Sequence, residues 1–365
     1  MMVNKTWKRF SNAGAWFLLT LVSRISGFLR SVLVARFLDP QTASLGFIAI
    51  SLAEGVRSLG EMGTAQIVVT RPEVGDRELG SAWWVEIGKF TLSTLVLVVL
   101  SFSGTWMFPQ LDSLIFLSAA SITLVRIGTN PVLFLWERNQ EMRFYLKVTS
   151  IASGVGLIAT GFLLALTGSW LALPLGVAVT SLVVTLASNV VGLSPKVLLK
   201  AESTTTWQFV REGVPYVAAG VAAYVSNLGL DLVLAFQGLS QEVAPYRLTA
   251  ALSFASIYVL PASLARASVA ADAAYRGESP AAQSQALLFS TSIAALATVS
   301  ALVVLAPIAG LLYGSTWRAP VGALMGPMCI LVGIRALAAP FGGLLIARGA
   351  HRSENVFRLT ESLIG

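Results

Sequence analysis

The sequence has very few of the side chains that enzymes use most for catalysis and for metal binding. Among 365 residues there is one cysteine, Cys329, and one histidine, His351. A disulfide within the chain needs two cysteines, and a zinc site or a serine–histidine–aspartate triad draws on histidines and cysteines. These absences weigh against disulfide-rich folds, against zinc sites and against most hydrolases, and we expect no metal and no catalytic residue.

Charged residues are also scarce. They make up 12% of the chain, against about 25% in a soluble domain, whereas 55% of the residues are hydrophobic and the mean hydropathy is +0.76. Stretches of about 20 apolar residues predict membrane-spanning helices. We place ten complete spans, and the start of an eleventh near Val356, at residues 13–38, 44–70, 82–107, 113–136, 146–167, 170–193, 213–237, 244–271, 285–312 and 320–347. The predicted fold class is therefore an all-α polytopic membrane protein.

The positive residues are unevenly distributed between the loops that join these spans. Fifteen lysines and arginines fall on the side of the N-terminus, whereas the other side has only Arg318. Because cytoplasmic loops carry the excess of Lys and Arg, we expect a cytoplasmic N-terminus. The net charge of +7 is then explained by the basic residues of the cytoplasmic loops, and nucleic acid is not an expected partner.

Two parts of the chain are weakly similar to each other. A shift of 201 residues places Arg30 over Asp231, and a shift of 209 residues places Arg126 over Arg335. If this is a repeat, residues 1–200 form a lobe of six helices and residues 201–365 form a second lobe, related by an axis along the membrane normal. The substrate site is then expected between the lobes, near the midplane. The second lobe stops inside its fifth helix, so we expect it to be incomplete.

Three charged residues in the second span lie on one helix face. Glu54, Arg57 and Glu61 are spaced i, i+3 and i+7, so Arg57 is within reach of either acid. They either close the second helix onto the first or form a charged wall of a cavity. We favour the cavity, with the two acids in gating or coupling, because ionisable residues inside a membrane usually mark pathways.

The first span contains three arginines at intervals of six residues. Arg24 and Arg30 converge if the helix bends at Ser26-Gly27, a common cause of kinks. Arg36 lies near the outer end, where a long side chain reaches the interface. We therefore take Arg24 and Arg30, but not Arg36, as candidates for substrate binding.

Three further charges fall inside other spans. Arg126 and Arg335 each precede a proline by five residues, so they either satisfy carbonyl groups freed by a kink or line the cavity. Asp231 occupies the repeat position of Arg30, and we predict that the two form a gate pair. Arginines outnumber acids among all these candidates. Since the planar guanidinium group suits phosphate oxygens, we expect an anionic, phosphorylated substrate.

Several motifs resemble one family of membrane transporters. The run Ser23-Arg24-Ile-Ser-Gly27-Phe28-Leu-Arg30 resembles the first-helix signature of the multidrug/oligosaccharidyl-lipid/polysaccharide (MOP) flippase superfamily. The run Leu59–Val69 resembles the end of the second helix of that superfamily. Similarity to its polysaccharide transporter branch, which holds the Wzx-type oligosaccharide flippases and is related to the lipid II flippases, lies at Asn130-Pro131, Trp136–Arg138, Arg211–Pro215 and Leu312–Trp317.

This resemblance implies a two-lobe, MATE-like helical bundle in the bacterial plasma membrane, without enzymatic chemistry. It implies a flippase that moves a polyprenyl-diphosphate-linked oligosaccharide, such as an O-antigen, capsule or exopolysaccharide unit, by alternating access. Arg24, Arg30 and Arg57 would contact the head group. The expected partners are the undecaprenyl-diphosphate-linked sugar, membrane lipids, and polysaccharide polymerase and chain-length proteins.

The resemblance implies no cofactor, and transport would be driven by a proton or sodium gradient or by the membrane potential. Lipid II flipping is the alternative within the same fold. A membrane-embedded polymerase or ligase is the alternative from another class, although the short outer loops disfavour it. A third possibility is an inactive relative that serves as a partner protein.

Overall fold

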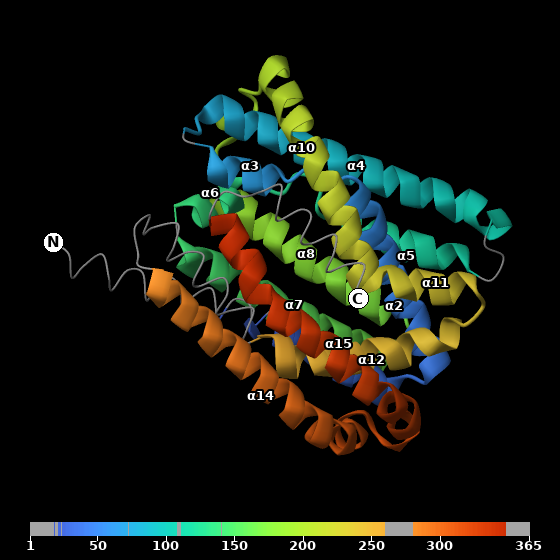
Figure 1. Cartoon of the computed structure of the whole chain (residues 1–365). Helices are drawn as coiled ribbons and strands as arrows, with labels where there is room; N and C mark the ends of the chain where they lie inside the picture. Colours follow the sequence, from blue (N-terminus) through green and yellow to red (C-terminus); the bar gives the residue numbers. More distant parts are fainter. Residues whose placement is uncertain are drawn as a thin grey trace. The chain divides into compact units, whose positions relative to one another are not determined.

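The computed structural model of the chain describes residues 18, 21–22, 24–71, 73–107, 111–139, 141–259 and 280–347, and every regular element in these ranges is a helix (Figure 1). The all-α class is therefore confirmed. The contacts divide the chain into two compact units. The central unit is Gln41–Val243, and the terminal unit combines Met1–Pro40 with Ala244–Gly365. The lobes predicted from the repeat, 1–200 and 201–365, stay a prediction.

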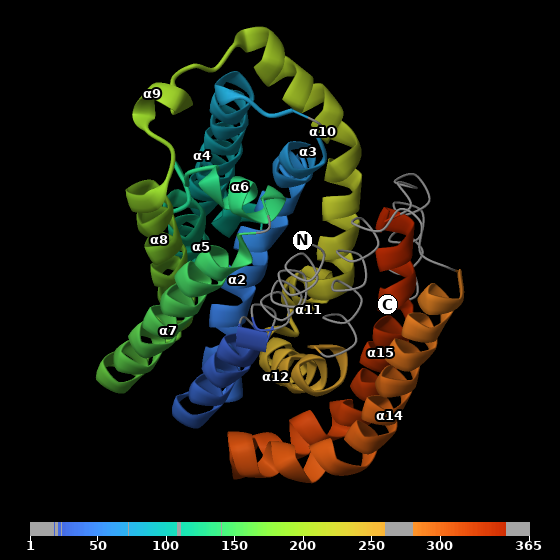
Figure 2. The same cartoon turned by 90° about the vertical axis from the view of Figure 1, so that its left-hand side faces the viewer.

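The central unit is built mostly from long apolar helices that pack in pairs. Helices α7 and α8 lie side by side, as do α4 and α5 (Figure 2). Its elements are α2 (Pro40–Leu59), α3 (Thr64–Thr70), α4 (Asp76–Met107), α5 (Ser113–Leu124), α6 (Val132–Arg138), α7 (Met142–Thr167), α8 (Ala172–Val191), α9 (Pro195–Leu198), α10 (Ser203–Tyr224), the π-helical turn η1 (Val225–Gly229), α11 (Leu230–Phe236) and the 3-10 turn η2 (Ser240–Glu242).

Two of the predicted spans are broken helices. The span predicted at 44–70 divides into α2 and α3 around Gly63, which adopts a φ of 55°. The span predicted at 113–136 divides into α5 and α6 around Gly128, which has a φ of 82°. Both angles belong to the left-handed region that glycine adopts without steric cost. The prediction of a continuous helix was therefore wrong at both places. The apolar stretch continues across each break, so hydropathy alone does not reveal that the backbone leaves the helix there.

The close contact between α7 and α8 depends on two glycines that face two threonines. A Cβ atom added at Gly156 would lie 1.8 Å from Thr180 Oγ1, and one added at Gly176 would lie 1.9 Å from Thr160 Oγ1. Each threonine hydroxyl also donates to the carbonyl four residues earlier in its own helix, at 2.8 and 3.0 Å. Small residues let helix backbones approach closely in a membrane, and these four residues bring the two helices together.

The terminal unit has residues 24–37 in a helix and two long helices that run side by side, α14 (Pro280–Tyr313) and α15 (Ser315–Ala347) (Figures 1 and 2). Between them in the chain order lie α12 (Val243–Ser253) and the π-helical turn η3 (Phe254–Tyr258). The Trp317 indole donates to the Ala35 carbonyl at 2.8 Å, and the Tyr313 hydroxyl donates to the Leu248 carbonyl at 2.9 Å. These bonds join the first helix and α12 to the α14–α15 pair.

Arg36 has a structural role that its position in the sequence did not reveal. Its guanidinium group donates to the carbonyl oxygens of Leu311 and Leu312, the latter at 2.7 Å. These carbonyls belong to the last turn of α14, where helix carbonyls lack partners within the helix. Arg36 therefore caps α14, while its side chain stays exposed as expected for a residue near a helix end.

Within the described part of the chain, five helices are long and apolar enough to cross a membrane by length and composition: Asp76–Ser103, Arg143–Thr167, Ala172–Val191, Thr291–Tyr313 and Ser315–Ala338. Of the two broken helices, α5 is apolar but has only 12 residues. The other, α2, has 20 residues but includes Glu54 and Arg57. The predicted first and eighth spans lie partly outside the described residues, and the predicted eleventh span lies wholly outside them. The total of ten complete spans therefore stays a prediction.

Candidate functional site

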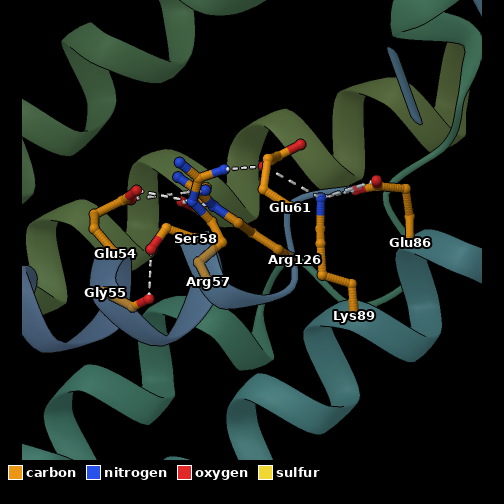
Figure 3. A network of polar contacts seen from close by, with 9 residues as sticks. Glu54, Gly55, Arg57, Ser58, Glu61, Glu86, Lys89 and Arg126 are labelled. Carbon is orange, nitrogen blue, oxygen red and sulfur yellow. Dashed lines mark hydrogen bonds and ion pairs between the residues drawn. The ribbon is translucent and has the colours of Figure 1, made fainter. Parts of the chain in front are cut away.

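The charged residues of the second predicted span form a connected set of ion pairs (Figure 3). Arg57 bonds to Glu54 through Nε and to Glu61 through Nη1, both at 2.8 Å. The pairing predicted from the i, i+3 and i+7 spacing is therefore present. Glu61 is not on the helix itself, since α2 ends at Leu59, and it reaches Arg57 from the turn that separates α2 from α3.

The same network extends to two other helical segments (Figure 3). On α4, Lys89 lies 3.8 Å from Glu61 and 2.7 Å from Glu86. In the break between α5 and α6, Arg126 Nη1 lies 3.9 Å from Glu54 Oε1, and its Nε donates to Ser181 on α8 at 3.1 Å. Arg126 therefore contacts a carboxylate of another helix as well as a polar neighbour on α8.

Glu86 and Lys89 are not among the candidates from the sequence, because both lie near one end of the span predicted at 82–107. The Lys89 side chain is only 4% exposed, so its ammonium group is buried inside the central unit. The signal that could have identified the pair is its i, i+3 spacing, the same pattern that linked Glu54 to Arg57.

The network contains three carboxylates and three basic groups, so its formal charges cancel. Two of its members, Glu61 and Arg126, lie in the breaks of the two discontinuous helices. Irregular backbone within a membrane protein is found where it is buried in protein or lines a cavity, and broken helices frequently mark transport sites. The central unit therefore has a polar, charge-neutral centre built around its two broken helices.

Asp231 lies at a third helix irregularity, in α11 directly after the π-helical turn η1. Its side chain is fully buried and accepts a hydrogen bond from the Ser51 hydroxyl on α2. This contact joins α11 to α2 inside the central unit. Arg30 belongs to the terminal unit, so the predicted gate pair between Arg30 and Asp231 stays a prediction.

In the terminal unit, two of the predicted arginines lie against one aromatic ring. The guanidinium carbon of Arg24 is 5.7 Å from the centroid of the Phe254 ring, and that of Arg335 is 5.9 Å from the same centroid. Tyr258 meets the Phe254 ring edge-on at 5.5 Å and lies 6.0 Å from Arg24. Sequence reasoning missed both aromatic residues, because an aromatic residue in an apolar helix is usually part of the core.

The terminal unit is rich in positive charge. Its described residues include a single acidic residue, Asp39, against six arginines at positions 24, 30, 36, 247, 318 and 335. Arg335 lies in the middle of α15 and is buried, whereas Arg318 lies near the start of that helix and is exposed. The two units therefore differ in character, with a charge-neutral network in one and an excess of guanidinium groups in the other.

The fold is that of a known class of membrane transporters. An inward-facing multidrug resistance MATE family transporter of the MOP superfamily is similar with a TM-score of 0.67 and 15% identity, over 95% of this chain and 84% of that chain. A MATE structure in complex with MaL6 is similar with a TM-score of 0.59 and 13% identity, over 98% and 86%. An outward-facing MATE family transporter gives a TM-score of 0.52 at 13% identity, over 98% and 84%. The chain is a multi-pass membrane protein with the MOP superfamily fold.

The family follows from the sequence itself. Residues 33–321 match the family model described as polysaccharide biosynthesis protein, so the chain belongs to that family. A comparison with curated protein sequences finds no match. The resemblance to the polysaccharide branch of the MOP superfamily is thereby confirmed.

Proposed function

We propose that this protein is a flippase that moves a polyprenyl-diphosphate-linked oligosaccharide across the bacterial plasma membrane by alternating access. Membership in the polysaccharide biosynthesis family and the MOP fold support this proposal. The observation that carries it is the convergence of Arg24 and Arg335 on one ring in a unit that is rich in arginine. A diphosphate is the part of such a lipid that guanidinium groups recognise best.

In this proposal the arginines of the terminal unit bind the head group. Arg24, Arg30 and Arg335 would supply planar N–H donors to the diphosphate oxygens, in surroundings of low dielectric constant that strengthen the attraction. No bond is made or broken, because the protein only has to bind the head group on one side and release it on the other.

In this proposal the ion-pair network of the central unit controls access of the substrate, and it is not the first site to bind the head group. Arg57 is held by Glu54 and Glu61, whose oxygens occupy the N–H groups that a phosphate would need. Release of either ion pair would make an N–H group of Arg57 available to the substrate. In this proposal Glu54 and Glu61 keep the gating or coupling role predicted from the sequence, and a proton or sodium gradient or the membrane potential drives transport.

The test is transport by the full-length protein in liposomes, with a fluorescent polyprenyl-diphosphate sugar and a membrane-impermeant quencher that reports which leaflet holds the lipid. Each lost charge-assisted bond is worth about 1.5–3 kcal/mol, so Arg24→Ala and Arg335→Ala should each slow flipping about tenfold or more. Arg318→Ala is the matched control, because Arg318 lies near the start of α15, away from the mid-helix position of Arg335, and should leave the rate unchanged.

Absence of flipping by the unmodified protein, or equal rates for Arg24→Ala and Arg318→Ala, would contradict the proposal. A second set of liposomes contains lipid II in place of the oligosaccharide lipid. Faster flipping of lipid II would assign the protein to peptidoglycan precursor transport instead.

A further inference from the structure

The aromatic residues beside the two arginines lie on a π-helical turn. This turn, η3, begins at Phe254 and ends at Tyr258. A π-helical turn accommodates one extra residue, which rotates the side chains that follow it by about 100° from their places in a regular α-helix. Such turns are frequent at functional sites, so the side chains that this turn orients are candidates for a function.

The position of the turn is fixed from its N-terminal side. Ser253 is fully buried, and its hydroxyl donates to the sulfur of Met325 on α15 at 3.6 Å. The next residue, Phe254, then faces Arg335, which is also on α15. Ser253 and Phe254 therefore contact the same long helix through consecutive side chains, and this fixes the ring beside the guanidinium group of Arg335.

The Phe254 ring is an electrostatic partner for both arginines. Each guanidinium carbon lies within 6 Å of its centroid, the range in which the negative face of an aromatic ring attracts a cation. A guanidinium group also suits phosphate oxygens, with which it forms charge-assisted hydrogen bonds. Two guanidinium groups at one ring therefore suit a ligand that carries two phosphates.

We propose that Phe254 is a positioning residue that holds Arg24 and Arg335 as the two arms of a clamp for a diphosphate head group. The inference rests on the proposed flippase function and extends it to a residue outside the charged set. Tyr258 supports the clamp by its edge-on contact with the Phe254 ring and by its own contact with Arg24. A diphosphate presents oxygens on two phosphorus atoms, so both arms are used, whereas a monophosphate satisfies only one.

The experiment compares binding of a fluorescent prenyl diphosphate and the corresponding prenyl monophosphate to the full-length protein in detergent micelles. Phe254→Leu keeps an apolar side chain and removes the π face, so diphosphate affinity should fall about tenfold and monophosphate affinity only about twofold. Phe254→Tyr keeps the π face and should restore wild-type binding. Phe162→Leu on α7 is the matched control, since that ring is exposed and should have no effect.

A cycle with Arg335 separates positioning from a merely structural effect. Because Phe254 acts through the arginine, Phe254→Leu should have little further effect on diphosphate affinity in an Arg335→Gln background. An equal loss of affinity for diphosphate, monophosphate and neutral prenol would overturn the inference, as would a tenfold effect that persists in Arg335→Gln. If Phe254→Leu does not fold, Phe254→Met is measured for the same ratio of affinities.

The outcome for the clamp is distinguishable from the outcome for the proposed function. If the unmodified protein flips the lipid but Phe254→Leu binds diphosphate normally, the clamp is wrong and the flippase stands. If Phe254→Leu loses diphosphate affinity selectively but the unmodified protein flips nothing, the flippase is wrong and the clamp stands.

Discussion

Replacement of Arg57 by methionine should be among the most destabilising single changes in the central unit. Removal of one partner of a buried ion pair costs about 3–5 kcal/mol, because the remaining charge stays buried. Here Glu54 and Glu61 lose their nearest partner, but Arg126 stays 3.9 Å from Glu54 and Lys89 stays 3.8 Å from Glu61. The side chains of Arg57, Glu54 and Glu61 are also 30, 23 and 26% exposed, so the remaining partners and water offset part of the loss. We therefore expect Arg57→Met to lower the unfolding free energy by about 2–3 kcal/mol.

The reasoning is tested most sharply by a double-mutant cycle with Glu54. Glu54→Gln leaves Arg57 paired with Glu61 and should cost about 1 kcal/mol, and the double variant should cost less than the sum by about 1–2 kcal/mol. Arg57→Lys should lie between the wild type and Arg57→Met, because an ammonium group lacks the planar fork that reaches both acids. The measurement is denaturant-induced unfolding of the full-length protein in micelles, followed by tryptophan fluorescence.

A surface ion pair provides the control for this cycle. Arg77 pairs with Glu202 at 3.2 Å, but its side chain is 71% exposed. Arg77→Met should therefore change the unfolding free energy by less than about 0.5 kcal/mol. Equal effects of Arg57→Met and Arg77→Met, or strict additivity of Arg57→Met and Glu54→Gln, would refute the view that the network acts as a buried unit.

The same unfolding measurement checks three further predictions. Gly156→Ala should cost about 1–3 kcal/mol because its Cβ would overlap Thr180, whereas Gly154→Ala, which meets open space on the same helix, should be neutral or slightly stabilising. Arg36→Leu should cost about 1 kcal/mol by uncapping α14, and a wild-type Tm would contradict that capping role. Glu212→Gln removes the pair with Arg71, at 3.0 Å, and should cost less than about 1 kcal/mol at low salt and nothing at high salt, since the Glu212 side chain is half exposed. A salt-independent loss would show that this pair is buried.

Local spacing and hydropathy were enough to predict the long helices and the pairing of Arg57. The helices α4, α7, α8, α14 and α15 follow from continuous apolar stretches, each close to the predicted span. Arg57 was expected to meet Glu54 because residues three apart share a helix face, and it does so at 2.8 Å. Both inferences use only neighbours within one segment, which is the information that a single sequence carries directly.

The breaks in the helices depend on contacts that no local pattern reveals. Gly63 has a positive φ, and a Cβ atom there would lie 2.4 Å from the ring of Tyr216 on α10. An aromatic ring far along the sequence therefore occupies the space that a side chain at position 63 would need. Glycine is also common within continuous membrane helices, so its presence at position 63 did not distinguish a break from close helix packing.

The site differs from its sequence prediction through the same kind of distant contact. The sequence allows Arg126 either to satisfy backbone carbonyls or to line a cavity, whereas in the structure it contacts Glu54 on α2 and Ser181 on α8. Phe254 carried no signal at all, since only the fold brings residues 24 and 335 to its ring. Predicting these contacts requires knowing which helices are neighbours, which hydropathy does not supply.

The difference in charge between the two units indicates which unit would select the substrate if this protein is a flippase. A network whose charges cancel attracts neither a phosphate nor a cationic drug at long range, because its internal pairs already satisfy one another. Selection for an anion must then come from the terminal unit, in whose described residues six arginines accompany one acidic residue. Adding an acid beside the clamp should therefore abolish the preference, so Ser253→Asp should weaken diphosphate binding far more than Ser253→Asn, which has a similar volume and no charge. Equal binding by the two variants would show that anion selection arises elsewhere in the chain.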